Sequence, residues 1–234
     1  MSYLETLTED LLEEAAIEIL GEMGDEHRFG PDIAHDGEAP ERVDYKEVFL
    51  SNRVKDALVR INKDIPRAAL EDAYRQIITF NSPSLVENNH YCHKLLTEGI
   101  EVSFKEKDLI RTKRAYLIDF ENVDRNDFLV VNQFTIQGVE NRRPDLILFV
   151  NGLPLVVVEL KSASDENVGI ENAYNQIITY KKDVENLFYY NAFCIISDGI
   201  NAKAGSITSD LERFMNWRSE DGDTIAPLTI PQDE

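Results

Sequence analysis

Apolar residues recur at helical spacing near the start of the chain. Over residues 6–23 they lie three or four positions apart, at Leu12, Ala16, Ile19 and Met23. This spacing predicts an amphipathic helix over 6–23. Thr6 and Glu9 form a capping-box pattern at its start, and Gly24 is suited to its end.

The following residues predict a loop and then more helices. Residues 25–45 are rich in Gly, Pro and Asp, which is typical of an irregular loop. Helical patterns occupy about 46–62 and 66–79, and a turn and a short helix follow, ending near Gly99. The first hundred residues are therefore expected to be mostly helical.

After Gly99 the pattern favours strands. Strand-like stretches occupy 100–107, 115–120 and 128–136 by their β-branched and aromatic content. Two further strands, 145–150 and 153–161, are joined at Asn151-Gly152, a strong hairpin signal. A helix over 167–183 and a buried strand over 191–199 complete the series. The order predicts an α/β fold whose mixed central sheet of about five strands is flanked by helices.

Composition excludes several protein classes. The chain of 234 residues is 43% hydrophobic, which argues against wholesale disorder. It has no apolar run of membrane-spanning length, and its acidic N-terminus does not resemble a signal peptide. Two distant cysteines, Cys92 and Cys194, make a disulfide framework or a zinc site unexpected. We therefore expect a cytoplasmic protein without a membrane partner.

The formal net charge of −20 is unevenly distributed. Residues 1–50 contain 15 acidic residues against three Lys or Arg, so the remainder of the chain is closer to neutral. A solvated helical face explains such a block most simply, and a partner-binding or DNA-repelling surface is the alternative. The distribution leaves room for a local basic groove.

Asp145, Glu159 and Lys161 carry the candidate chemistry. If pairing runs evenly from the Asn151-Gly152 turn, Asp145 lies opposite residue 158, next to Glu159. Glu159 and Lys161 are two apart and share a strand face. Two adjacent carboxylates suit Mg²⁺, and a neighbouring ammonium can orient or activate water for attack on a phosphodiester. A buried Asp145–Lys161 salt bridge is the structural alternative.

The helix after this hairpin adds polar residues. Gln176 and Tyr180 are four positions apart and share one helical face, where they could also be an ordinary amphipathic surface. Positive charges flank the carboxylates on both sides in sequence, at Arg142, Arg143, Lys181 and Lys182. Such charges favour the approach of a phosphate backbone.

These residues carry a resemblance to a known family. The stretches RRPDLILFVNGLPLVVVELK and NQIITYK resemble the PD-(D/E)xK nuclease superfamily with its QxxxY extension. Over roughly 9–218, including SPSLVENNHYCHKLLTEGI and NAFCIISDGINAKAGS, the chain resembles the N-terminal endonuclease domain of the restriction (R) subunit of type I restriction–modification enzymes. Pro144-Asp145, Glu159-x-Lys161 and Gln176-xxx-Tyr180 fill that family's pattern.

The resemblance implies specific roles for residues. Asp145 and Glu159 would be metal ligands with the Leu160 carbonyl, and Lys161 would position or activate water. A first-helix glutamate of the family corresponds to Glu13 or Glu14. Gln176 and Tyr180 would hold the backbone or the lysine, and the flanking Arg142, Arg143, Lys181 and Lys182 would help to position DNA.

The resemblance also implies a function. Residues 1–218 would form the endonuclease domain, with a mainly helical part over 1–99 and a catalytic sheet core over 100–200. Residues 219–234 would be a tail or the start of a linker to an ATP-dependent translocase. The domain would cleave double-stranded DNA with Mg²⁺, or Mn²⁺ as a substitute, in a complex with modification and specificity subunits.

Two other functions remain open at this point. One is a repair or junction nuclease of the same superfamily, and the other is a non-catalytic module that docks onto a partner subunit. The chain has no GxxxxGK[ST] phosphate loop, so we expect ATP to act only on the full-length subunit and not to bind this chain.

Overall fold

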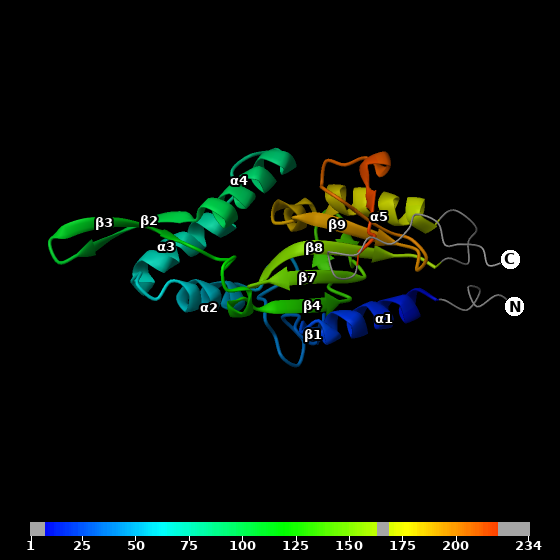
Figure 1. The fold of residues 1–234 in the computed structure, drawn as a ribbon, viewed down its shortest axis with the longest axis horizontal. Coiled ribbons are helices and arrows are strands. Elements are labelled where there is room, and N and C mark those ends of the chain that lie inside the picture. The colour runs from blue at the N-terminus through cyan, green and yellow to red at the C-terminus, as the bar shows by residue number, and fades with distance from the viewer. Residues whose placement is uncertain (1–7, 163–168, 220–234) are drawn as a thin grey trace, which may run out of the picture.

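The computed structural model describes residues 8–162 and 169–219 and has an α/β fold (Figure 1). Its α-helices are α1 (Glu9–Glu22), α2 (Ser51–Ile61), α3 (Arg67–Ile78), α4 (Leu85–Glu98) and α5 (Gly169–Asp183). Its longer strands are β1 (Glu26–Phe29), β2 (Ile100–Glu106), β3 (Leu109–Ala115), β4 (Phe128–Asn132), β7 (Leu146–Val150), β8 (Leu153–Leu160), β9 (Phe193–Ser197) and β10 (Ala202–Gly205). Shorter elements are β5 (Ile136–Gln137), β6 (Asn141–Arg142), β11 (Met215–Asn216) and the 3₁₀ turns η2 (Val123–Arg125), η3 (Glu185–Tyr189) and η4 (Leu211–Arg213).

A mixed sheet of seven strands forms the centre, in the order β1-β4-β7-β8-β9-β10-β11. The β4, β7 and β8 strands form an antiparallel series, and β9 returns parallel to β8 after α5. This connection follows the usual strand–helix–strand arrangement for parallel neighbours. The central hairpin and the helix that follows it are therefore held side by side.

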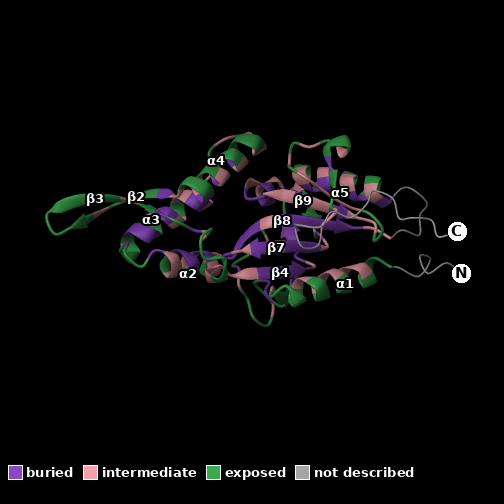
Figure 2. Ribbon diagram, viewed as in Figure 1, coloured by how far each residue is buried: buried purple, intermediate pink, exposed green. Residues whose placement is uncertain are grey.

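The two faces of this sheet pack against different helices. In β4, Leu129 and Val131 belong to the main core with α5, whereas Val130 belongs to a smaller cluster beneath α1. Such alternation is expected of a strand buried on both faces. The buried strands β4, β7 and β8 contrast with α1, which is largely exposed and has no fully buried residue (Figure 2).

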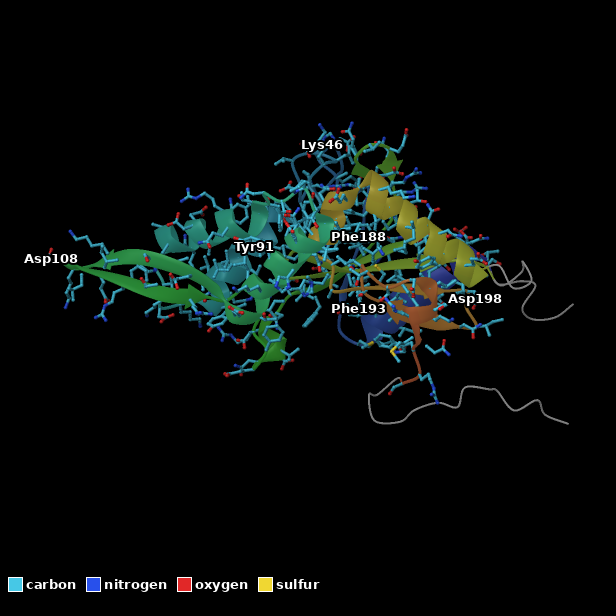
Figure 3. All side chains as sticks on the ribbon, turned by 90° about the horizontal axis from the view of Figure 1, so that it is seen from above. Lys46, Tyr91, Asp108, Phe188, Phe193 and Asp198 are labelled. Atoms are coloured by element: carbon cyan, nitrogen blue, oxygen red, sulfur yellow. The ribbon has the colours of Figure 1, made fainter. Side chains whose placement is uncertain are left out.

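Helices α2, α3 and α4 extend the molecule away from the sheet, and the β2–β3 hairpin lies at their far end (Figure 1). Asp108, in the hairpin turn, marks that end of the molecule, and Asp198, directly after β9, lies toward the other (Figure 3). Among the described helices, none has the length and apolar character needed to cross a membrane.

Two expectations about the first fifty residues are wrong. The first helix begins at Glu9, and its N-cap is Thr8, whose side chain accepts from the Leu11 N–H at 3.3 Å, so Thr6 and Glu9 do not form the cap. Thr6 itself lies outside the described residues. Residues 25–45 are not only loop, since β1 lies within them and pairs in parallel with β4 at the edge of the sheet.

The strand predictions need three corrections. The partner of β2 is Leu109–Ala115, and residues 116–120 are not strand. The predicted strand over 128–136 is interrupted after Asn132, because Gln133 adopts a left-handed backbone with φ of 56°. The central sheet has seven strands instead of about five, because β1, β10 and β11 add to the predicted set. The hairpin at Asn151-Gly152, the α5 helix and β9 are confirmed.

Candidate active site

The β7–β8 hairpin brings Asp145 and Glu159 together at its open end. Pairing is even near the turn, but an extra residue in β8 shifts the register, so that Leu146 pairs with Val158. This β-bulge corrects the predicted register by one residue and brings position 145 level with Glu159. The Asp145 carboxylate also accepts the backbone N–H of Leu160 at 2.7 Å, which fixes it against the end of β8.

Glu159 is almost fully buried, with 2% of its surface exposed, and both carboxylate oxygens accept hydrogen bonds. One accepts from the Lys161 ammonium at 2.9 Å, and the other accepts from the Tyr180 hydroxyl at 3.0 Å. Lys161 also donates to the Leu160 carbonyl at 2.9 Å. Within the described residues, the ion pair of Lys161 on this hairpin is with Glu159, so the alternative of an Asp145–Lys161 salt bridge is not the one formed.

The charges of this group are poorly balanced. Burial raises the pKa of Asp145, and the Lys161 charge offsets this only in part. Burial and the Asp145 charge raise the pKa of Glu159 to about 7. Burial alone would lower the pKa of Lys161, but its hydrogen bond to Glu159 and the negative charges of Glu159, Asp145 and Glu9 together outweigh that effect and raise it. Two carboxylates thus compete for one ammonium, a situation typical of functional sites.

Helix α1 brings further carboxylates to the site. Glu13 is half-buried and accepts the side-chain amides of Asn132 at 2.8 Å and Gln133 at 2.7 Å. Glu9 lies 3.5 Å from the Lys161 ammonium. Glu14 is exposed on the same helix. Of the two glutamates considered from the sequence, Glu13 is therefore the one that faces the sheet.

The Gln176–Tyr180 pair lies against Glu159. Tyr180 is buried on α5, and its hydroxyl lies 3.0 Å from Glu159 and 3.5 Å from the Arg143 carbonyl. The Gln176 side chain hydrogen-bonds Tyr180. The predicted pairing on one helical face is confirmed, but the direct contact is with the Glu159 carboxylate and not with the lysine.

The four basic residues predicted beside the site are placed differently from one another. Arg142 forms an ion pair with Asp183 at 2.5 Å, and the Lys181 ammonium donates to the Ile207 carbonyl at 2.8 Å. Arg143 and Lys182 are exposed. Arg143 directly precedes the Pro144-Asp145 step, so it is the predicted basic residue nearest in sequence to the carboxylates.

Sequence reasoning missed four residues at this site. Glu9 lies in a run of acidic residues that offers no signal to single it out. Asn132 and Gln133 interrupt an apolar strand, and this was a usable signal, since two amides after FLVV disagree with a buried strand. His27 contacts Asn132 from 105 positions away, a pairing that only the tertiary structure reveals.

The donor set suits a hard divalent cation. Asp145, Glu159 and the Leu160 carbonyl offer oxygen ligands, which Mg²⁺ prefers, and Mg²⁺ often binds through only one or two carboxylates plus waters and substrate phosphate. Over residues 8–162 and 169–219 there is no group of three or more His, Cys, Asp or Glu side chains arranged to hold a metal ion. Two carboxylates and one carbonyl would leave the remaining ligand positions of a cation to water and substrate.

Known proteins match nearly the whole chain. Residues 6–213 match the family described as "Type I restriction enzyme R protein N terminus". The HindI endonuclease subunit of Haemophilus influenzae is 35% identical over 92% of this chain and 21% of its own length. The putative MjaIXP endonuclease subunit of Methanocaldococcus jannaschii is 34% identical over 93% of this chain and 21% of its length.

A third relative, the EcoprrI endonuclease subunit of Escherichia coli, is 37% identical over 50% of this chain. The chain spans about a fifth of the length of the first two relatives. The matched region includes the β7–β8 hairpin, α5 and α1. The chain therefore belongs to the family of the N-terminal part of the type I restriction enzyme R protein.

Proposed function

We propose that this chain is the endonuclease part of a type I restriction enzyme and cleaves phosphodiester bonds of double-stranded DNA with Mg²⁺. The observation that supports this most is the pair of carboxylates at the open end of β7–β8, the buried Glu159 and the half-buried Asp145, with Lys161 in contact with Glu159. Family membership supports the restriction role, because the relatives are named endonuclease subunits. The core is of the PD-(D/E)xK type in this proposal.

Asp145, Glu159 and the Leu160 carbonyl would hold the cation, with Mn²⁺ as a substitute. A cation held there would stabilise the negative charge that develops on the phosphate and would favour deprotonation of the attacking water. The Lys161 ammonium contacts both Glu159 and the Leu160 carbonyl, so it would have to move aside for these oxygens to hold a cation. From there it can orient water or neutralise charge on the phosphate. Tyr180 donates to the other Glu159 oxygen and would restrain the orientation of that carboxylate.

Exposed basic side chains would guide the DNA substrate to the site. Arg143 and Lys182 are exposed and would contact phosphates, whereas Arg142 and Lys181 are occupied by Asp183 and by the Ile207 carbonyl. The net charge of −20 disfavours spontaneous association with DNA. We therefore expect the chain alone to cleave DNA weakly. The translocase part of the subunit and the modification and specificity subunits would deliver DNA to it, and ATP would act on the translocase.

The test uses the full-length subunit assembled with its modification and specificity subunits. Lys161→Ala should lower the cleavage rate on the order of a hundredfold to a thousandfold, because it removes a positioned charge from the reacting phosphate. ATP hydrolysis and translocation should stay near normal. Lys105→Ala, in the remote β2–β3 hairpin, is the matched control and should leave both unchanged.

Two outcomes would contradict the proposal. Cleavage at the parent rate in Lys161→Ala would place the nuclease site elsewhere and would favour a docking role for this chain. Loss of ATP hydrolysis together with cleavage would show that Lys161 acts through assembly of the complex.

A further inference from the structure

We propose that Asn132 and Gln133 are positioning residues, whose side-chain amides orient the Glu13 carboxylate toward the metal position beside Asp145. This inference rests on the proposed function, since it concerns the same cation. It assigns a role to two residues that supply no ligand themselves. We call the two side-chain amides the amide clamp.

The clamp holds both oxygens of one carboxylate. The Asn132 amide donates to one Glu13 oxygen at 2.8 Å, and the Gln133 amide donates to the other at 2.7 Å. Two donors from adjacent residues fix the plane and the direction of the carboxylate, which a single hydrogen bond would not do. Partners that orient a carboxylate near a metal tune the binding of that metal.

The clamp is built on the strand that lies beside Asp145. Asn132 pairs with Leu146 in the β4–β7 ladder, and the Gln133 N–H donates to the Asp145 carbonyl at 3.2 Å. Gln133 thus contacts the Glu13 carboxylate through its side chain and the Asp145 carbonyl through its backbone, and so links the two residues. Lys161 forms ion pairs with Glu159 at 2.9 Å and with Glu9 at 3.5 Å, and Glu13 would add a further negative charge beside this group.

The backbone of Gln133 adopts an uncommon left-handed conformation, with φ of 56°. Gln133 is one of three non-glycine residues with positive φ in the described chain, together with Lys107 and Asn151. Strained residues persist where the surroundings determine them, and they concentrate at functional sites. Glycine at position 30 leaves room for the Gln133 backbone in this conformation, because a Cβ at residue 30 would lie 2.6 Å from the Gln133 carbonyl oxygen.

A third partner fixes the orientation of the Asn132 amide. The His27 Nε2–H donates to the Asn132 side-chain oxygen at 2.9 Å, which leaves the amide nitrogen to face Glu13. Asn132 is 8% exposed, so a rotated amide would find few alternative partners. The chain from His27 through Asn132 to Glu13 joins β1, β4 and α1 at one edge of the site.

The simplest rival is that the clamp only attaches α1 to the sheet. Helix α1 has no fully buried residue, so its attachment draws on polar contacts as well as on the small apolar cluster beneath it. An attachment role predicts a loss of helix protection when the clamp is cut. An orienting role predicts a loss of metal affinity while the helix stays in place.

Gln133→Gly separates the two roles. Glycine adopts positive φ without steric cost, so the variant removes the amide and keeps the backbone. We expect Mn²⁺ to bind the 234-residue chain about tenfold more weakly in this variant by isothermal titration, the lower range for loss of an orienting partner. Hydrogen exchange of the α1 amides should match the parent.

Lys107→Gly is the matched control. Lys107 has φ of 58° in the exposed turn between β2 and β3, so the substitution makes the same backbone change far from the site. It should leave Mn²⁺ affinity unchanged. Any loss of stability common to both glycine variants is then a general effect of glycine in the unfolded chain.

Each result has a defined meaning. Mn²⁺ affinity equal to the parent in Gln133→Gly would overturn the clamp proposal. Weaker affinity accompanied by faster exchange throughout α1 would overturn it too, in favour of helix attachment. Asp145→Asn distinguishes the underlying metal site: if the parent does not bind Mn²⁺, or if Asp145→Asn binds it like the parent, the proposed function fails at this site and the clamp proposal fails with it.

Discussion

The two ends of the β7–β8 hairpin both bury polar side chains, but they differ in how completely their charged groups are paired. At the turn, Asn151 is fully buried and its amide makes four hydrogen bonds. Its oxygen accepts from the Asp127 N–H and from Arg60, and its nitrogen donates to the Leu117 carbonyl and the Asn126 side chain. All of its hydrogen-bonding capacity is used.

The charges near this turn are paired. Arg53 contacts Glu41 at 2.5 Å and both Asp127 and Glu26 at 3.0 Å. Hydrogen bonding to Glu41 raises the pKa of Arg53 despite burial. Burial raises the pKa of Glu26, but Arg53 and Arg28 outweigh it and lower the pKa overall. The charged forms are therefore the favoured ones at the turn.

At the open end the protein environment disfavours the charged forms of the carboxylates. Both Asp145 and Glu159 have raised pKa values, and within the described residues Asp145 has no ion-pair partner within 4.0 Å. A satisfied network stabilises a fold, whereas an unbalanced buried charge reduces stability and is retained for another reason. The turn therefore stabilises the fold, whereas the open end has negative charge that a bound cation would offset.

The largest expected effect on stability is at the turn. Asn151→Ala should lower the free energy of unfolding by about 3 kcal/mol or more, because it leaves buried donors and acceptors without partners and places alanine at φ of 52°. Urea denaturation measures the change. Asn151→Gly loses the same side-chain hydrogen bonds but adopts positive φ without steric cost, so it should remain destabilised by most of that amount.

If the open end resembled the turn, neutralising one of its carboxylates would lower the free energy of unfolding as much as Asn151→Ala does. We predict the opposite for Glu159→Gln. The pKa of Glu159 is about 7 in the folded chain against 4.5 for the ordinary group, so the folded state binds its proton more tightly than the unfolded state does. The contribution of protonated Glu159 to the free energy of unfolding is fully present below pH 4.5 and is lost as pH rises through 7.

The metal-free parent should therefore lose a few kcal/mol relative to Glu159→Gln between pH 4.5 and 8. Denaturation of both chains across this range in chelator gives the difference. A parent chain that gains stability over Glu159→Gln as pH rises would show that the charged carboxylate is well compensated, and the open end would then resemble the turn.

The smallest expected effect concerns Tyr180. Tyr180→Phe removes one donor to Glu159 and should cost about 1 kcal/mol of stability at pH 8, where that carboxylate is charged. The loss should fade at pH 4.5, where Glu159 is protonated. Thermal denaturation at the two pH values measures it, and Tyr174→Phe, on the same helix but directed at the Ser209 carbonyl, is the control. A loss independent of pH would indicate that Tyr180 acts by packing alone.

Local signals predicted much of the fold. The Asn151-Gly152 turn fixed the hairpin, and apolar spacing located α2, α3 and α5 within a few residues. The β1 strand escaped detection, because its four residues are all exposed and show no alternation. The bulge in β8 escaped too, since nothing in LPLVVVEL indicates which residue is extra.

The candidate site was predictable as a set of residues more than as a set of contacts. The proximity of Asp145 and Glu159 followed from the hairpin, and the shared face of Gln176 and Tyr180 followed from the helix. The pairing of Lys161 with Glu159 did not follow, because strand register alone leaves the reach of a flexible lysine undetermined. The contact of Glu13 with residues more than a hundred positions away depends on how α1 packs on the sheet.

The most direct test for a metal site at the open end of β7–β8 is a crystal structure of the chain soaked with Mn²⁺, with the ion located by its anomalous scattering. We predict a peak bonded to the Asp145 and Glu159 carboxylates and to the Leu160 carbonyl, with the Lys161 ammonium displaced from that carbonyl. The absence of a peak at saturating Mn²⁺, or a peak whose ligands include neither carboxylate, would contradict the claim that the open end of the hairpin is a metal site.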